Sequence, residues 1–343
     1  MHLRTESKPA VAMNSRERVT RAVEFSGPDR IPVRHAVLPA AFAAHGQALV
    51  DILNEFPDDF HANWTLPGPE DMPELYSRGT HTDEWGCGWR TEHPGMLGIC
   101  IGHPLQDWTN WSSYKFPDIP PKQHFDELQS DLQQGHERYV FGFGTNIFER
   151  MQWLRGYQTL LCDIALRSQE AYDLRDAYIE WAVDYAQRSA RTDVEAMHYS
   201  DDWGTQAALI ISPDAWREFY KPAYQKMFQP AKTAGKHVHF HTDGFTWEIL
   251  HDLIEVGVDV LNIQHTIMDI RAVGKEFGGK VAFRSDLDRQ HILPHGSPRQ
   301  VRDHVREVVD CLGSFGGGLI GHGEVGPDVP LENVRAMFEA WRE

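Results

Sequence analysis

The second half of the chain alternates short apolar runs with longer amphipathic segments, and this alternation constrains the fold more than any other feature. The apolar runs predict strands at residues 196–200, 237–241, 258–263, 280–284 and 318–320. The amphipathic segments predict helices at residues 214–235, 246–256, 268–277, 298–312 and 331–341. Repeated strand–helix units joined by short turns are typical of a parallel sheet.

Two architectures share this alternation, a closed (β/α)₈ barrel and an open doubly wound sheet. An open sheet usually carries a glycine-rich phosphate turn after its first strand, and none follows the predicted strand Arg30–Val33. We therefore predict a single (β/α)₈ TIM barrel over residues 14–343, preceded by a flexible leader at residues 1–13. Residues 57–125, rich in proline and tryptophan, predict an elaborated N-terminal excursion that forms an antiparallel cap over the barrel mouth.

Charge and hydropathy exclude several classes of partner. The formal net charge of −17, from 50 acidic and 33 basic residues, argues against binding to nucleic acid or to an anionic membrane. No apolar run approaches the roughly 18–20 residues of a membrane-spanning helix, and the N-terminal segment lacks the apolar core of a signal peptide. We expect a cytoplasmic protein that acts on a small molecule.

Three histidines alternate with apolar residues in the segment His237-Val-His-Phe-His241. In a strand, alternate residues share a face, so the imidazoles would point into the barrel lumen. His239 and His241 lie nearest the carboxyl end, where barrel active sites form. They are candidate metal ligands, with His322 of Gly321-His-Gly323 as the third. The alternative is a polar lumen whose histidines only form hydrogen bonds.

Other polar residues follow the remaining strands. Asp202 is a candidate general acid or base, or only a helix cap. Asp243 is a candidate for orienting an imidazole, or for starting the next helix. Arg284 and Asp286 would face the mouth and bind substrate, or either would only form an ion pair in a lid over the site.

Five ordered motifs resemble the uroporphyrinogen decarboxylase superfamily. They are Ser200-Asp-Asp-Trp-Gly-Thr-Gln206, His241-Thr-Asp-Gly244, Gly257-Val-Asp-Val-Leu-Asn262, Gly321-His-Gly323 and Pro330-Leu-Glu-Asn333. The resemblance covers about residues 14 to 343. It implies a TIM barrel and one of two activities, that of the decarboxylase itself or that of the zinc-binding, cobamide-dependent methyltransferases.

The resemblance to the decarboxylase is weakest where that enzyme uses an arginine-rich loop to hold the carboxylates of a tetrapyrrole. At that place this chain reads Val33-Arg-His-Ala-Val-Leu-Pro-Ala40, with one arginine and with His35 as the expected substrate contact. Burying several carboxylates without matching guanidinium groups is costly. We therefore do not expect uroporphyrinogen to be the substrate.

The methyltransferases carry a His-x-Cys pair where this chain has His239-Phe-His241, and a later cysteine near the Gly-His-Gly segment. Three neutral imidazoles would not compensate the +2 charge of the ion, whereas thiolates would compensate part of it. An uncompensated ion is a stronger Lewis acid, which favours polarising an ether or alkoxide oxygen over activating a thiol. The substitution is equally compatible with loss of the metal.

These features lead to one working hypothesis and two rivals. The first is a zinc-dependent, corrinoid-linked methyltransferase of the demethylase type, with zinc on His239, His241 and His322, with Asp202, Asp243 and His322 serving catalysis, and with a corrinoid protein as partner. The second is a metal-free decarboxylase acting on a carboxylic acid, centred on His322 and Asp202. The third is a non-catalytic binding barrel. A homodimer is compatible with each of them.

Overall fold

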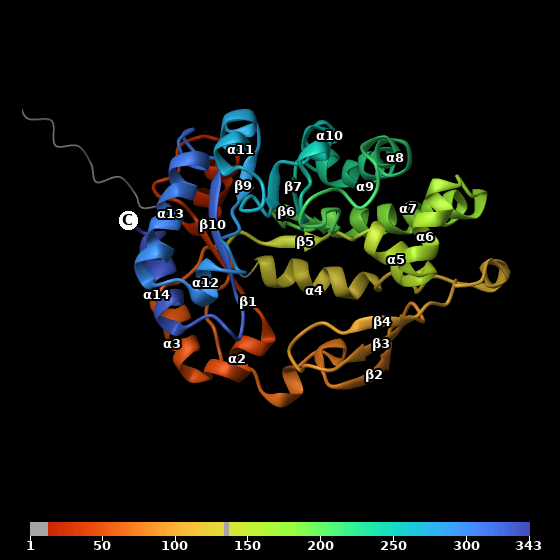
Figure 1. The fold of residues 1–343 in the computed structure, drawn as a ribbon, viewed down its shortest axis with the longest axis horizontal. Helices are drawn as coiled ribbons and strands as arrows, with labels where there is room; N and C mark the ends of the chain where they lie inside the picture. Colours follow the sequence, from red (N-terminus) through yellow and green to blue (C-terminus); the bar gives the residue numbers. More distant parts are fainter. Residues whose placement is uncertain (1–12, 134–136) are drawn as a thin grey trace, which may run out of the picture.

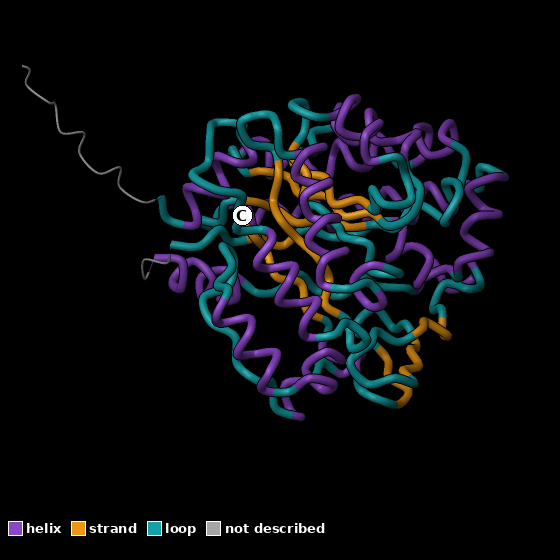
Figure 2. The backbone as a smooth tube through the Cα atoms, turned by 60° about the vertical axis from the view of Figure 1, so that its left-hand side comes forward, coloured by secondary structure: helices purple, strands orange, loops and turns teal. Residues whose placement is uncertain are grey.

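The computed structural model describes residues 13–133 and 137–343. A curled sheet of seven parallel strands forms the core of this part of the chain (Figure 1). In spatial order the strands are β1 (Val33–Val37), β10 (Leu319–Val325), β9 (Ala282–Arg284), β8 (Val260–Ile263), β7 (His237–Thr242), β6 (Ala196–Ser200) and β5 (Phe141–Phe143). Figure 2 shows the strands at the centre of the molecule with helices around them. The predicted leader, residues 1–13, lies outside the described residues except for Met13.

The sheet closes into a barrel through residues 58–60, which form backbone hydrogen bonds toward both edges of the sheet. The Asp59 amide donates to the Val33 carbonyl at 2.8 Å, and the Tyr139 amide donates to the Asp59 carbonyl at 3.2 Å. Val33 begins β1, and Tyr139 lies two residues before β5. Residues 58–60 therefore act as the eighth strand of the predicted barrel.

The helices lie outside the sheet and return the chain from each strand to the next. They are α1 (Ser15–Val23), α2 (Pro39–His45), α3 (Gln47–Glu55), α4 (Lys122–Gln133), α5 (Phe148–Arg155), α6 (Tyr157–Ala165), α7 (Gln169–Ala190), α8 (Pro213–Phe219), α9 (Lys221–Thr233), α10 (Leu250–Glu255), α11 (Ile270–Phe277), α12 (Ile292–His295), α13 (Pro298–Leu312) and α14 (Leu331–Ala340). Short 3₁₀ turns are η1 (Pro69–Asp71), η2 (Glu74–Tyr76), η3 (Trp108–Ser113) and η4 (Trp247–Ile249). No helix in the described ranges is both long and apolar enough to cross a bilayer.

The predicted helix 214–235 is two helices, α8 and α9. Pro222 stands in the first turn of α9, and a proline there has no amide with which to continue the hydrogen bonds of the preceding helix. The predicted strand 196–200 and the predicted helix 298–312 agree with β6 and α13.

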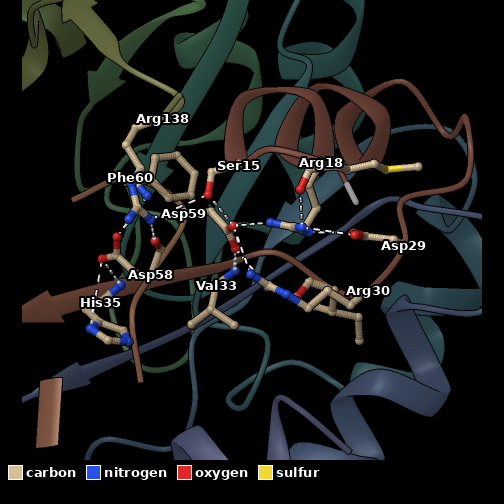
Figure 3. Close-up of polar contacts among 12 residues, drawn as sticks. Ser15, Arg18, Asp29, Arg30, Val33, His35, Asp58, Asp59, Phe60 and Arg138 are labelled. Carbon is tan, nitrogen blue, oxygen red and sulfur yellow. Dashed lines mark hydrogen bonds and ion pairs between the residues drawn. The ribbon is translucent and has the colours of Figure 1, made fainter. Parts of the chain in front are cut away.

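A charge network holds the amino-terminal end of the barrel together (Figure 3). The carboxylate of Asp59 is fully buried and accepts hydrogen bonds from Arg18 at 2.7 Å, from Arg30 at 2.9 Å and from the Val33 amide at 2.9 Å. Arg18 lies on α1, so this network joins α1 to the start of β1. Val19 and Val23 of α1 then close the bottom of the lumen against an apolar layer.

The predicted antiparallel cap is present within residues 57–125. It consists of β2 (Gly79–Thr82), β3 (Gly88–Thr91) and β4 (Ile99–Gly102), paired antiparallel in that order. The Gly95 carbonyl accepts from the Ala40 amide at 3.3 Å, which ties the cap to the start of α2 just beyond β1. The cap therefore lies at the carboxyl end of the barrel.

Candidate active site at the carboxyl end of the barrel

An inner pocket of about 170 Å³ lies at the carboxyl ends of the strands. It is lined by Arg34, Ala36, His241, Asn262, Arg284, Asp286, Arg289, His322 and Glu324. These side chains come from β1, β7, β8, β9, β10 and the loop after β9. The carboxyl end of a parallel barrel is where its active sites form, and a lining rich in charged groups suits a polar ligand.

A wider outer pocket of about 680 Å³ shares Arg289 and Glu324 with the inner one. Its remaining lining includes Leu38 and Ala40 near β1 and Met96 of the cap. The outer pocket is mainly apolar and leads toward the inner pocket. The cap thus contributes to the approach to the site and not to its polar centre.

Asp202, His241 and Asp243 form a cluster with the geometry of a metal site. One potential ligand atom from each lies within 4.8 Å of the other two. The Nε2 atom of His241 is 3.6 Å from an Asp202 oxygen and 3.7 Å from Asp243 Oδ1. Among the residues that the structure describes, this is the group of three histidine, cysteine or acidic side chains that is close enough to share an ion.

Hydrogen bonds determine which nitrogen of His241 faces the two carboxylates. The Asn262 amide nitrogen donates to the Arg284 carbonyl at 2.8 Å, so the Asn262 oxygen accepts the hydrogen bond with His241 Nδ1 at 2.8 Å. His241 therefore donates from Nδ1. Its Nε2 atom faces Asp202 and Asp243, and either a proton or a metal ion there balances their charge.

Two glycines bring the loops after β6 and β7 close enough to assemble this cluster. A Cβ atom on Gly204 would lie 2.3 Å from the Phe245 amide nitrogen, and one on Gly244 would lie 2.1 Å from Gly204 backbone atoms. Gly244 also has a φ of +86°, which favours glycine. The Asp243 amide donates to Asp202 at 3.0 Å across the same contact.

The adjacent acids Asp201 and Asp202 point in different directions. Asp201 is fully buried and accepts from the Ile147 amide at 2.9 Å, the Glu149 amide at 2.8 Å and the Tyr224 hydroxyl at 2.6 Å. It caps α5 and serves the fold. Burial raises the pKa of Asp202, while the His241 charge opposes that shift.

His239 does not join the cluster, so the predicted ligand set of His239, His241 and His322 is not the one that the structure brings together. His239 is 1% exposed, its Nε2 atom is 3.1 Å from the Tyr139 hydroxyl, and its ring packs edge-on against Phe141 at 4.8 Å. It faces the lumen as predicted but lies one layer below the pocket. Burial, reinforced by the Arg284 charge, lowers its pKa well below the usual value.

His322 lines the pocket but lies outside the three-residue cluster. It is 6% exposed, and its Nδ1 atom has no hydrogen-bond partner among the described residues. Burial and then the charge of Arg284 lower its pKa well below the usual value, so the imidazole is neutral. A neutral imidazole with a free nitrogen suits a substrate contact.

His35, the expected substrate contact, lies on the wrong face of β1. Its ring stacks on Phe338 of α14 at 4.1 Å, outside the barrel. Because successive strand residues alternate, its neighbour Arg34 faces the lumen and lines the pocket instead. We therefore replace His35 by Arg34 in the candidate site.

Arg284 and Asp286 both line the pocket, as the sequence predicted. Arg284 is 3% exposed and donates to the Asn262 oxygen at 2.6 Å, and its Nε and Nη1 atoms have no partner in the described part of the chain. Asp286 is 5% exposed, and burial raises its pKa to about 7. Asp286 forms its ion pair with Arg289, at 3.9 Å, and not with Arg284.

Arg289 is a site residue that sequence reasoning missed. It contacts Asp243 through a short ion pair and lies 3.4 Å from Glu324 and 3.9 Å from Asp286. Burial lowers its pKa, but these three carboxylates outweigh burial and raise it overall. No periodic signal marks a loop arginine, and its position between the two pockets appears only in three dimensions.

Comparisons with known proteins agree with this architecture. The family model described as uroporphyrinogen decarboxylase (URO-D) matches residues 122–343. Uroporphyrinogen decarboxylase from Legionella pneumophila is 27% identical over 263 residues, which cover 72% of this chain and 71% of that protein. Methylated-thiol–coenzyme M methyltransferase from Methanosarcina mazei is 24% identical over 179 residues, covering 51% of this chain and 45% of that protein.

A solved structure of a methyltransferase from Methanosarcina mazei shares the fold, with a TM-score of 0.67 at 16% identity, and the match covers 96% of this chain and 98% of that chain. The family model spans well over half of this chain, from α4 to the last residue, and includes six of the seven barrel strands. The relatives include both decarboxylases and a methyltransferase. The chain belongs to the uroporphyrinogen decarboxylase family.

Proposed function

We propose that this protein is a zinc-dependent methyltransferase of the demethylase type, which passes a methyl group to a corrinoid carried by a separate protein. The observation that carries the proposal is the arrangement of His241 Nε2 opposite Asp202 and Asp243. The methyltransferase among the relatives supports the reaction class. The ligand set replaces the His239 and His322 of our sequence prediction.

The residues of the cluster fit zinc. Imidazole nitrogen and carboxylate oxygen are both zinc ligands, and catalytic zinc commonly has three protein ligands and one open position. Asp243 Oδ1 is buried without a hydrogen-bond partner in the described residues, as expected for a carboxylate oxygen that binds a cation. Two carboxylates also compensate the +2 charge of a divalent ion. The three neutral imidazoles of the sequence hypothesis would have left that charge uncompensated. Zinc held there would act as a Lewis acid on the oxygen that carries the methyl group.

The remaining side chains of the pocket would bind and orient the methyl donor. Neutral His322 offers its free Nδ1 to a polar group of the substrate. Asp286, whose pKa is about 7, would hold a proton near neutral pH and could release it to the departing oxygen. Asn262 keeps His241 in the tautomer that turns Nε2 toward the two carboxylates.

The first test is the zinc content of purified protein. We expect about one zinc per chain in the wild type and a loss in His241→Ala and Asp243→Asn. The matched controls His251→Ala and Asp214→Asn alter side chains that are 62% and 98% exposed, and should keep the metal. Zinc absent from the wild type, or retained in both cluster variants, contradicts the proposal.

The second test is methyl transfer itself. Reduced cobalamin would be offered as a free acceptor together with a panel of methyl ethers, and methylation of the cobalamin would be followed by absorbance. We expect methylation that needs the protein, a methyl ether and zinc, and that disappears in Asp243→Asn. Activity that survives full removal of zinc rules out the mechanism.

A metal-free decarboxylase remains the second candidate because the pocket holds proton donors suited to neutral pH. Asp286 has a pKa of about 7, and protonation of the carbon left by carbon dioxide needs such an acid. Carbon dioxide release from a candidate acid that continues in the presence of a chelator would favour this function over methyl transfer.

A further inference from the structure

Two guanidinium groups lie in the lumen of the barrel without a carboxylate to pair with them. In the described part of the chain, no acidic oxygen lies within 4.0 Å of Arg34 or Arg284, whereas the buried Arg18 and Arg289 both pair with acidic side chains. Arg34 Nε, Arg284 Nε and Arg284 Nη1 are buried and have no hydrogen-bond partner there. A buried arginine normally uses its donors, so these unused donors need an explanation.

The side chains around the two arginines do not explain these unused donors. Arg34 lies over the Phe141 ring at 5.4 Å. Arg284 Nη2 donates to Asn262 Oδ1 at 2.6 Å and lies 3.2 Å from His198 Nε2. None of these partners is an acidic group. Burial, and after it the charge of Arg34, lowers the pKa of Arg284, so the charge of Arg34 disfavours that of Arg284.

The neighbouring ionisable groups do not neutralise the two arginines either. Burial lowers the pKa values of His198 and His322, which leaves both imidazoles neutral. Asp286 and Glu324 of the lining lie against Arg289, at 3.9 Å and 3.4 Å, and burial raises the pKa of Asp286 to about 7. Arg34 and Arg284 are therefore the two arginines of the lining without an acidic partner in the described residues.

We propose that Arg34 and Arg284 form a binding site for the carboxylate of a small substrate, at the base of the inner pocket. A carboxylate there would accept hydrogen bonds from the unused donors and relieve the repulsion between the two cations. The inner pocket volume of about 170 Å³ is below the usual range of roughly 300–1,000 Å³ for ligand pockets, so the part of the substrate that reaches the two arginines is small.

This inference rests on the proposed function only in taking the pocket as the place where substrate binds. A methyl donor would then carry a carboxylate in addition to its methyl group. His241 belongs to the metal cluster and donates to the same Asn262 oxygen as Arg284, so the anion and the reacting atom would lie side by side in one pocket.

The test is calorimetric binding of acetate and benzoate to protein treated with a chelator, with acetamide and benzamide as neutral analogues of the same shape. We expect at least one of the two acids to bind, at least tenfold more tightly than its amide. Arg34→Gln and Arg284→Gln should each weaken that binding at least tenfold. Arg271→Gln, whose side chain is 73% exposed and pairs with Glu307, should leave it unchanged.

Several outcomes would overturn the inference. They are an absence of binding by both acids, equal binding of acid and amide, unchanged binding in the two pocket variants, or binding of inorganic phosphate in preference to both acids. If Arg284→Gln does not fold, Arg284→Lys and Arg34→Gln carry the test, because the lysine keeps the charge and loses the planar group.

The result is independent of the metal hypothesis because the protein is free of metal throughout. Carboxylate binding without any zinc in the purified protein would leave the anion site standing and remove zinc-dependent methyl transfer. Zinc binding without carboxylate binding would have the opposite meaning.

Discussion

The two ends of the barrel treat buried charge in opposite ways. At the amino-terminal end, Asp59 is completely buried, and two arginines and a backbone amide bind it. At the carboxyl end, Arg284 and Asp286 are almost as buried, yet each keeps polar atoms without a partner in the described residues. Matched charge at one end holds the cylinder closed, and unmatched charge at the other is available to a ligand.

This difference bears on how a buried charge should be interpreted. A network whose partners are all supplied by the chain adds to stability or specifies the fold. Buried polar atoms without partners reduce stability, and they persist at sites where a ligand completes them. The contrast between the two ends is therefore the physical basis for placing the site at the mouth.

The largest expected effect is on stability at the closed end. Asp59→Ala would leave Arg18 and Arg30 without their shared carboxylate, and we expect a loss of about 3–5 kcal/mol in the free energy of unfolding. Urea denaturation measures it. Asp286→Ala, an equally buried acid at the mouth, should cost far less. Equal losses for the two variants would remove the distinction between the ends.

A second prediction concerns metal affinity at the open end. Asp243→Asn should weaken zinc binding by more than about 100-fold. Loss of a residue that only hydrogen-bonds to a metal ligand already lowers metal affinity by about 10–100-fold, and Asp243 is proposed as a ligand itself. Competition with a chromogenic chelator measures the affinity, with Asp214→Asn as the exposed control. An unchanged affinity would mean that the ion lies elsewhere.

Asp286 gives a dependence of stability on pH. Its folded pKa of about 7 is above the value near 3.9 of an unfolded aspartate, so the folded state binds more protons between these values. Its contribution to stability is therefore lost as the pH rises through this window, by about 2 kcal/mol from pH 5 to pH 7. In chelator-treated protein, Asp286→Asn should flatten the profile by that amount. A profile that is identical in the variant would show that this carboxyl titrates normally.

The smallest expected effect is a gain. Arg284→Met replaces a buried guanidinium that has no ion-pair partner with an apolar chain of similar length, and we expect about 1 kcal/mol of added stability in the absence of ligand. Thermal unfolding measures it. A clear loss of stability would indicate that Arg284 serves the fold.

The alternation of strands and helices in the second half predicted the fold well, because the spacing of apolar residues in each segment reflects the face that the segment buries. It did not reveal the eighth strand at residues 58–60. That segment contains Asp58 and Asp59, and it joins the sheet through two backbone hydrogen bonds, with its acidic side chains accepting from neighbouring arginines and amides. A polar strand of three residues has no apolar period to detect.

The sequence predicted which side chains of the candidate site face the lumen, but it did not predict how far along the barrel axis each of them lies. Alternation correctly turned His239 and His241 into the lumen, but only His241 reaches the mouth, because His239 pairs with Tyr139 below it. The first strand was expected at Arg30–Val33 and instead runs from Val33 to Val37, which exchanges the roles of Arg34 and His35. Face follows from local spacing, whereas depth depends on the register between strands that are far apart in the sequence.

Anomalous X-ray scattering, measured on both sides of the zinc absorption edge from crystals grown with zinc, would locate the ion. We expect one strong peak within bonding distance of Asp202, His241 and Asp243. A peak between His239 and His322, or no peak near any of these five residues, would contradict the proposed ligand set.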